Sequence, residues 1–218
     1  MEFTKQRHTR NVVSMLTKAY PRRGTALEFE NPWQLLIATI LSAQCTDVMV
    51  NKTTPKLFEA YPDPCALGHA DITAVEELVR PTGFYHNKAK SIVAASRVLC
   101  EESGGVVTPS MEMLTKLPGV GRKTANVVLA HAFGQQTVVV DTHVKRLSYR
   151  IGLTQSQDPE QVEQDIMAAV PKAHWNALCD ALIAHGRTIC TARRPQCSAC
   201  PISSLCPKNG VPESAHPQ

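Results

Sequence analysis

The sequence has no apolar run of the roughly 18 to 20 residues that a membrane-spanning helix needs. Its first ten residues are polar, so they do not resemble a secretory signal peptide. A basic start can imitate an organellar transit sequence, but Glu2 and the helical pattern that follows argue against one. We therefore expect a cytoplasmic protein without a membrane segment.

Strand signals are nearly absent as well. The only run of β-branched residues is Thr137–Val140, and the chain contains neither internal repeats nor low-complexity segments. At 218 residues and 43% hydrophobic, the chain can bury one sizeable core or two modest ones, which excludes a disordered protein. These features predict an all-α fold.

The charge is modest overall but unevenly distributed. The formal net charge is +4, yet residues 24–114 contain eleven acidic residues against six basic ones. The first 23 residues have one acid, Glu2, and six bases: Lys5, Arg7, Arg10, Lys18, Arg22 and Arg23. Basic ends suit a surface that faces DNA, although a solvated basic helix explains any one such cluster equally well.

The most informative stretch runs from Leu114 to Arg150. It contains Leu-Pro-Gly-Val-Gly-Arg-Lys at residues 117–123, where Gly119 and Gly121 are expected to adopt the positive φ values that a tight turn between two helices needs. The helix that follows spans residues 122–132 and ends at Gly134, so Lys123 lies in its first turn. The helix N-terminus and Arg122 disfavour the ammonium form of Lys123, which makes its amine a candidate nucleophile. Backbone N–H groups at such a hairpin also bind phosphate.

A carboxylate follows shortly downstream. Asp141 precedes Thr142 and His143 and is expected to cap a helix that runs through Arg150 and ends at Gly152. Each piece has a simpler interpretation: a structural connector, a surface lysine and a helix cap. Their occurrence together within a few dozen residues favours a catalytic interpretation.

Capping residues, prolines and glycines divide the remainder of the chain into further helices. A loop at residues 83–88 contains Phe84, which is either a core anchor or a ring that inserts elsewhere, and residues 207–218 are expected to be a frayed tail. Caps are expected at Asn31, at Thr46 or Asp47, and at Asp71. The expected helices are 4–20, 33–43, one from Thr46 or Asp47 toward 51, 71–80, 89–102, one from Thr108, 158–169 and 173–189.

Four cysteines lie close together near the end of the chain, at Cys190, Cys197, Cys200 and Cys206. Four thiolates this close can bind one tetrahedral zinc ion or one iron–sulfur cluster, and paired disulfides are disfavoured in a reducing compartment. The other four cysteines, Cys45, Cys65, Cys100 and Cys179, have no ligand spacing and are expected to be buried small apolar residues.

The hairpin with Lys123, followed by Val140-Asp141-Thr142-His143, resembles the endonuclease III branch of the helix-hairpin-helix DNA glycosylase superfamily. The resemblance extends from about Asn31 to Cys206. It implies two helical lobes with a DNA cleft between them. A six-helix bundle with the hairpin would span residues 22–134, and an iron–sulfur lobe residues 135–210. Residues 1–21 would add a helix to the second lobe, and 211–218 a tail.

The same resemblance implies a bifunctional DNA glycosylase and AP lyase of base excision repair. Lys123 and Asp141 would be the catalytic pair, and the substrates would be oxidised or ring-saturated pyrimidines. Adenine-removing relatives typically have Asn after Asp-Thr and lack the lysine, so His143 and Lys123 argue against that activity. The alternatives are a non-catalytic DNA-binding module with a structural metal site and an iron–sulfur electron carrier.

By the same resemblance, the four terminal cysteines would bind a [4Fe-4S] cluster, and the partner would be double-stranded DNA with damaged bases or abasic sites. Gln44 would fill the gap left by an extruded nucleotide, and Phe84 would be the apolar wedge where the family commonly has leucine. Arg193 and Arg194, between the first two ligands, would contact phosphates. We expect a monomer. The remaining expected DNA contacts are Leu117, Gly119, Val120, Gly121, Arg122 and His143.

Overall fold

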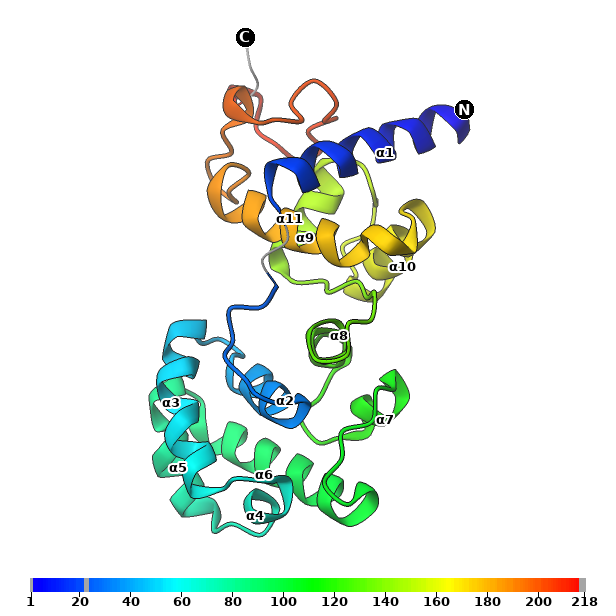
Figure 1. Ribbon diagram of the computed structural model, residues 1–218. Helices are drawn as coiled ribbons and strands as arrows, with labels where there is room; N and C mark the ends of the chain where they lie inside the picture. The colour runs from blue at the N-terminus through cyan, green and yellow to red at the C-terminus, as the bar shows by residue number, and fades with distance from the viewer. Residues whose placement is uncertain (1, 22–23, 216–218) are drawn as a thin grey trace. The chain divides into compact units, whose positions relative to one another are not determined.

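The computed structural model describes residues 2–21 and 24–215 of the chain. All regular structure in these residues is helical, with no strand, and Thr137–Val140 belongs to no regular element (Figure 1). The all-α prediction is therefore confirmed. Arg22 and Arg23 of the basic start, and residues 216–218 of the expected tail, lie outside the described residues. None of the described helices combines the length and apolar character needed to cross a bilayer.

The chain divides into two compact units, one of residues 25–135 and the other of residues 1–24 together with 136–218. Each unit has its own cluster of buried hydrophobic side chains.

The unit of residues 25–135 is arranged around α2 (Pro32–Leu41), which buries eight of its ten residues. Its neighbours α3 (Asp47–Ala60), α6 (Tyr85–Ser103) and α8 (Arg122–His131) pack against it. The shorter elements are α4 (Pro64–Gly68), α5 (Ile72–Val79), the 3-10 turn η1 (Arg80–Thr82) and α7 (Met111–Lys116).

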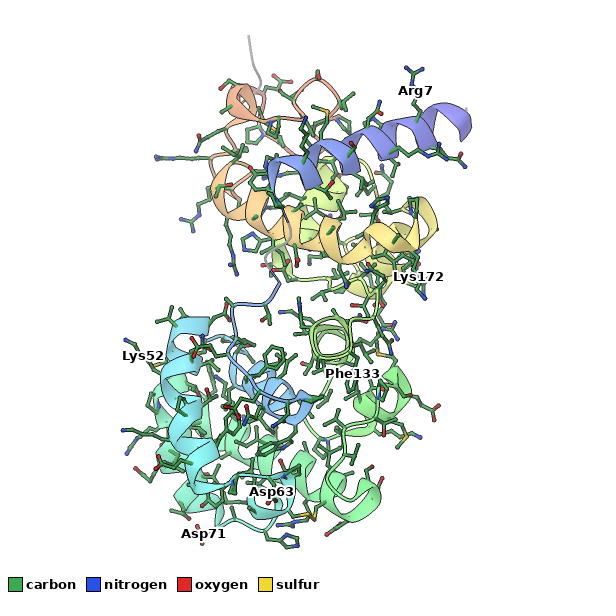
Figure 2. The ribbon with its side chains drawn as sticks, in the orientation of Figure 1. Arg7, Lys52, Asp63, Asp71, Phe133 and Lys172 are labelled. Atoms are coloured by element: carbon green, nitrogen blue, oxygen red, sulfur yellow. A yellow bond between two sulfur atoms is a disulfide. The ribbon has the colours of Figure 1, made fainter. Side chains whose placement is uncertain are left out.

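Side-chain caps fix where these helices begin. Asn31 accepts a hydrogen bond from the Gln34 N–H at the start of α2, and Asp71 accepts from two backbone N–H groups at the start of α5. Asp63, labelled with Asp71 in Figure 2, accepts a hydrogen bond from the Ala66 N–H at the start of α4. The predicted caps at Asn31, Thr46 and Asp71 are confirmed.

Two predicted helix starts are wrong. The helix expected from Ala89 begins at Tyr85, because the Lys88 N–H bonds the Phe84 carbonyl and the buried Lys88 ammonium donates to the Thr82 carbonyl at 2.7 Å. The helix expected from Thr108 begins at Met111, where Ser110 accepts from the Met113 N–H. In both cases a hydrogen bond sets the boundary.

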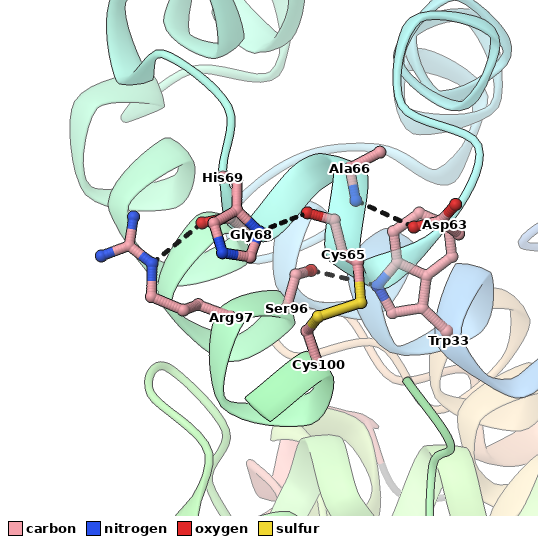
Figure 3. The surroundings of a disulfide bond; sticks show 9 residues. All are labelled: Trp33, Asp63, Cys65, Ala66, Gly68, His69, Ser96, Arg97 and Cys100. Carbon is pink, nitrogen blue, oxygen red and sulfur yellow. Dashed lines mark hydrogen bonds between the residues drawn. A yellow bond between two sulfur atoms is a disulfide. The ribbon is translucent and has the colours of Figure 1, made fainter. Parts of the chain in front are cut away.

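The interpretation of Cys65 and Cys100 as buried apolar residues is also wrong. Their sulfur atoms form a disulfide that joins α4 to the last turn of α6, with the two Cα atoms 5.0 Å apart (Figure 3). A hydrogen bond supports the same packing of α6 on α4, because the side chain of Arg97 donates from Nε to the Gly68 carbonyl at 2.9 Å. The bond joins residues 35 positions apart, so spacing along the chain could not indicate it. Cys179 is buried as predicted, and Cys45 is a half-buried free thiol.

The second unit packs α11 (Trp175–Thr188) against α9 (Thr142–Arg150) and α1 (Glu2–Ala19). Its other helical elements are α10 (Pro159–Ala169) and the 3-10 turns η2 (Lys172–His174), η3 (Cys197–Ala199) and η4 (Glu213–Ala215). From α1, Val12, Val13 and Leu16 enter the core as predicted. Ala19, expected on the same face, is exposed because it ends the helix.

Candidate functional site

The hairpin before α8 needs only one of its two glycines for its shape. Gly119 has φ +75°, and a Cβ there would lie 2.6 Å from Ser91 Cβ on α6. Gly121 has φ −93° and nothing within 4 Å of an added Cβ. Positive φ was expected to explain both glycines, and it explains only Gly119. Gly121 instead leaves open space at the helix start.

Lys123 lies in the first turn of α8 as predicted, with an exposed side chain. The cap residue Gly121 has no side chain to accept from the first N–H groups of the helix, which lack intrahelical acceptors. Within the turn, the Val120 N–H bonds the Leu117 carbonyl, so this amide is not available to a ligand. The side chains of Leu117 and Val120 are buried. The side chains of Leu117 and Val120 are therefore not presented to a ligand at the hairpin.

Two further predicted contacts occupy loops of the same unit. Gln44, between α2 and α3, has φ +53°, and Phe84, at the start of α6, has φ +49°. Left-handed backbone at residues other than glycine is costly, and such strain is often found at functional sites. Both side chains are exposed, and Phe84 presents 65% of its surface. This exposed ring excludes the interpretation of Phe84 as a core anchor.

In the other unit, Asp141 caps α9 as predicted. Its Oδ1 accepts a hydrogen bond from the Val144 N–H at 2.7 Å, and the side chain is half-buried. Two residues after Asp141, His143 Nδ1 lies 3.2 Å from Arg146 Nη2. Burial lowers the pKa of His143; Asp141 opposes this shift, whereas the charges of Arg146 and Arg187 add to it.

The start of α9 is connected to the cysteines through Arg146. Its Nη2 donates to the carbonyls of Gly186 at 3.0 Å and Cys190 at 3.1 Å. Gly186 permits this approach, because a Cβ there would lie 2.8 Å from His143 Nδ1. A side chain at position 186 would therefore displace His143 or Arg146.

All four terminal cysteines line one cavity. Their sulfurs form no disulfide. Three of them lie near nitrogen atoms. Arg150 Nη1 donates to Cys190 Sγ at 3.4 Å and the Lys208 N–H to Cys206 Sγ at 3.3 Å, and His185 Nε2 is 3.4 Å from Cys200 Sγ. Donors directed at sulfur are typical of the surroundings of iron–sulfur clusters.

The surroundings of these thiols favour their uncharged form. Burial, with the neighbouring cysteines, raises the pKa of Cys200 to about 11, and burial raises the pKa of Cys206. Iron in the cavity would stabilise the thiolates that these surroundings otherwise disfavour. In the described parts of the chain, no three His, Cys, Asp or Glu side chains are arranged to bind one metal ion. Cluster ligands each bind a different iron, so they stand farther apart than the ligands of a single ion. These residues fit a [4Fe-4S] cluster.

The loop between the first two cysteines is held by hydrogen bonds from Arg150 of α9 and by one bond within the loop. Arg150 donates to the carbonyls of Thr191 at 2.8 Å and Ala192 at 2.9 Å, and the Thr191 hydroxyl donates to the Arg194 carbonyl at 2.8 Å. Arg193 and Arg194 are both exposed. A fixed loop thus presents two guanidinium groups to solvent.

The predicted residues fall into two groups. Lys123, the hairpin, Gln44 and Phe84 belong to the unit of residues 25–135, whereas Asp141, His143, Arg193, Arg194 and the four cysteines belong to the other. Sequence reasoning missed the supporting residues Tyr20, Arg146, Arg150, His185 and Lys208. The positions of Arg146 and Arg150 at successive turns of one helix were a usable signal. Tyr20 and His185 gave none, since 165 positions separate them.

Known proteins are similar to this chain in sequence and in fold. The profile of the HhH-GPD superfamily of base excision DNA repair proteins matches residues 37–172, and that of the iron-sulfur binding domain of endonuclease III matches residues 190–206. Endonuclease III of Synechocystis sp. is 52% identical over 95% of this chain and 94% of its own length. Endonuclease III of Escherichia coli K12 is 41% identical over 89% of this chain and 92% of its own.

A solved structure of a trapped endonuclease III–DNA covalent intermediate has a TM-score of 0.87 and 40% identity, covering 93% of this chain and 96% of that one. The hairpin lysine, the capping aspartate and the cysteine cavity thus occur on a matching fold and in a closely similar sequence. The chain therefore belongs to the endonuclease III family of base excision DNA repair enzymes, bifunctional DNA glycosylases and AP lyases with a [4Fe-4S] cluster.

Proposed function

We propose that Lys123 is the nucleophile that removes the damaged base and that Asp141 assists it at the same deoxyribose. The observation that carries the proposal is the exposed amine in the first turn of α8, directly after a hairpin open to a ligand at Gly121. The trapped endonuclease III–DNA intermediate is covalent, which supports an enzyme nucleophile.

In this mechanism, neutral Lys123 Nζ attacks C1′ of the sugar. The N–C1′ bond to the base breaks, and the base leaves with the bonding electron pair and takes up a proton. Asp141 stabilises positive charge on the sugar ring and accepts a proton from the attacking nitrogen, giving a Schiff base after the ring opens. Loss of a C2′ proton then expels the 3′ phosphate, and water releases the lysine. The carboxylate caps α9 through one oxygen and has a second oxygen for this role.

Gln44 and Phe84 hold the opened duplex. A base inside a duplex cannot reach an active site, so the nucleotide is flipped out, and apolar wedges such as Phe stabilise the unstacked step. The exposed Phe84 ring and the strained backbone of both residues support this role.

The phosphate backbone is gripped at three places. Backbone groups around Gly119, Gly121 and Arg122 bind phosphate at the hairpin, and His143 lies at the start of α9. Arg193 and Arg194 add two charges from their fixed loop. When bound by the four cysteines, the cluster supplies the cross-link that keeps this loop in shape.

The substrate class is duplex DNA with oxidised or ring-saturated pyrimidines or abasic sites, and the enzyme acts as a cytoplasmic monomer. The lesion class follows from the family, since His143 and Lys123 occupy the positions at which adenine-removing relatives differ.

The test is borohydride trapping on a duplex with one abasic site, together with single-turnover base release from a thymine glycol duplex. Lys123→Ala should abolish the trapped adduct and lower base release by at least about 10³-fold, since the nucleophile is lost. Asp141→Asn should lower base release by about 10² to 10⁴-fold. Lys52→Ala, an exposed lysine on α3, is the matched control and should behave as wild type.

A protein that only binds DNA would give a different result. It would yield no adduct with wild type, and Lys123→Ala would change nothing but affinity. An undiminished adduct in Lys123→Ala would exclude this lysine from the chemistry.

A further inference from the structure

His185 on α11 lies between Tyr20 and the predicted cluster ligand Cys200. Its imidazole is 1% exposed, and its two nitrogens have different partners. Nδ1 is 2.9 Å from the Tyr20 hydroxyl oxygen, and Nε2 is 3.4 Å from Cys200 Sγ. The rings of Tyr20 and His185 also pack together, with centroids 5.4 Å apart.

The positions of the hydrogens follow from the chemistry of the partners. A neutral imidazole has one N–H donor and one acceptor nitrogen. A cysteine that binds iron is a thiolate and can only accept. Nε2 is therefore the donor to Cys200, Nδ1 is the acceptor, and the Tyr20 hydroxyl donates to it.

Tyr20 has a second, weaker acceptor for its proton. Thr188 Oγ1 lies 3.4 Å from the Tyr20 hydroxyl, and because it donates its own proton to the Ala184 carbonyl at 2.9 Å it can only accept from Tyr20. The shorter contact of Tyr20 is the one to His185. Tyr20 thus selects the Nε2–H tautomer of His185.

The other two sulfur contacts do not depend on a tautomer. Arg150 is a permanent cation, and the Lys208 donor is a backbone amide. Among these three, only the hydrogen bond to Cys200 can be switched off by moving one proton between ring nitrogens.

We propose that Tyr20 and His185 are positioning residues that direct one N–H···S hydrogen bond to Cys200 and thereby raise the reduction potential of the cluster. Such a bond stabilises the more negative, reduced state of the cluster over the oxidised state. The inference goes beyond base removal, because it concerns the electron affinity of the cofactor and needs neither Lys123 nor Asp141.

The tautomer is measured directly on the wild-type holoprotein by nitrogen-15 NMR with labelled histidine. His185 should show a protonated Nε2 and an unprotonated Nδ1. A protonated Nδ1 would overturn the proposal without any variant.

Variants then test the consequence for the cluster by spectroelectrochemical titration, at matched iron content and helicity. Tyr20→Phe keeps the ring and loses the hydroxyl, so its midpoint potential should shift to a more negative value. Thr188→Ala removes the second neighbour of Tyr20 and should leave the potential unchanged.

A double variant shows whether Tyr20 acts through the imidazole. Added to His185→Gln, the Tyr20→Phe change should cause no further shift. An unshifted Tyr20→Phe protein, an equal shift in the His185→Gln background, or an equal shift in Thr188→Ala would each refute the proposal. If His185→Gln loses its iron, the tautomer and the single variants decide.

Discussion

At the scale of single residues, the start of α9 combines a helix cap with an imidazole of altered basicity. Asp141 satisfies the Val144 N–H, while His143 packs against Gly186 and Arg146. Burial keeps the pKa of His143 below its ordinary value, with the charges of Arg146 and Arg187 acting in the same direction. The neutral imidazole is therefore favoured in the folded protein.

This shift predicts how stability depends on pH. In the unfolded chain His143 titrates near pH 6.5, so below that pH the unfolded state binds more protons than the folded state. The His143 contribution is complete above about pH 6.5 and is lost as the pH falls toward the lower folded pKa. His143→Gln should flatten this part of the profile, measured by denaturant unfolding at a series of pH values.

The matched control is His174→Gln, which removes an exposed histidine from the same unit. It should leave the acid slope as in wild type. Equal slopes for His143→Gln and wild type would show that His143 does not contribute.

Some site residues could be predicted from their neighbours in the sequence, whereas others depend on the packing of distant segments. Asp141, Asn31 and Asp71 were predictable as caps because a cap depends on residues two or three positions away. The role of Gly121 was not, because a glycine motif does not reveal which member has positive φ. Tyr20 with His185 was hidden as well, since the contact depends on how α1 packs on α11.

At the scale of elements, the hairpin before α8 separates a structural glycine from one that leaves room for a ligand. Gly119→Ala should cost about 2 to 4 kcal/mol of unfolding free energy, since it combines positive φ with a contact too close to Ser91. Gly121→Ala should cost no more than about 1 kcal/mol, the range of an N-cap change, yet weaken binding to abasic-site DNA. Chemical denaturation and fluorescence anisotropy measure the two effects.

Each glycine variant is the control for the other, because one is expected to lose stability and the other to lose DNA affinity. If Gly121→Ala binds DNA as wild type does, the hairpin does not grip the backbone through this position. A Gly119→Ala protein as stable as wild type would contradict the packing on α6.

The disulfide between α4 and α6 is an element-scale feature that should stabilise the unit of residues 25–135. It joins residues 35 positions apart, and closing a loop of that length corresponds to about 3 to 4 kcal/mol in the chain-entropy description. The double variant Cys65→Ala with Cys100→Ala should lower the unfolding free energy by that order. Cys45→Ala, at a half-buried free thiol, is the comparison and should cost less.

Some helix starts are set by a capping residue in the local sequence, and one is set by a buried side chain. The starts of α2, α5 and α10 follow their caps. The start of α6 does not, because Phe84 caps it with left-handed backbone and the buried Lys88 ammonium secures the preceding turn. Burial of that ammonium lowers its pKa, and nothing in the local sequence indicates that a lysine is buried there.

At the scale of the whole molecule, the chain has two units with separate cores, and the proposed chemistry needs residues from both. DNA binding should therefore respond to charges in the unit that does not contain the nucleophile. Arg193 and Arg194 belong to the cysteine-bearing unit, whereas Lys123 belongs to the other.

Each phosphate contact adds a defined increment to the salt dependence of binding. Arg193→Ala and Arg194→Ala should each reduce the slope of log K against log salt by about 1, and the double variant by about 2. Anisotropy titrations over a range of salt concentrations measure the slope, and Lys52→Ala should leave it unchanged. A double variant with the wild-type slope would contradict the phosphate role of this loop.

The central claim is that the Lys123 amine becomes bonded to the sugar of the damaged nucleotide. Its most direct test is mass-spectrometric peptide mapping of the borohydride-reduced protein–DNA adduct. The account predicts that the sugar remnant is found on the peptide that contains Lys123, at that side chain. A remnant on another lysine or on the N-terminal amine would contradict it.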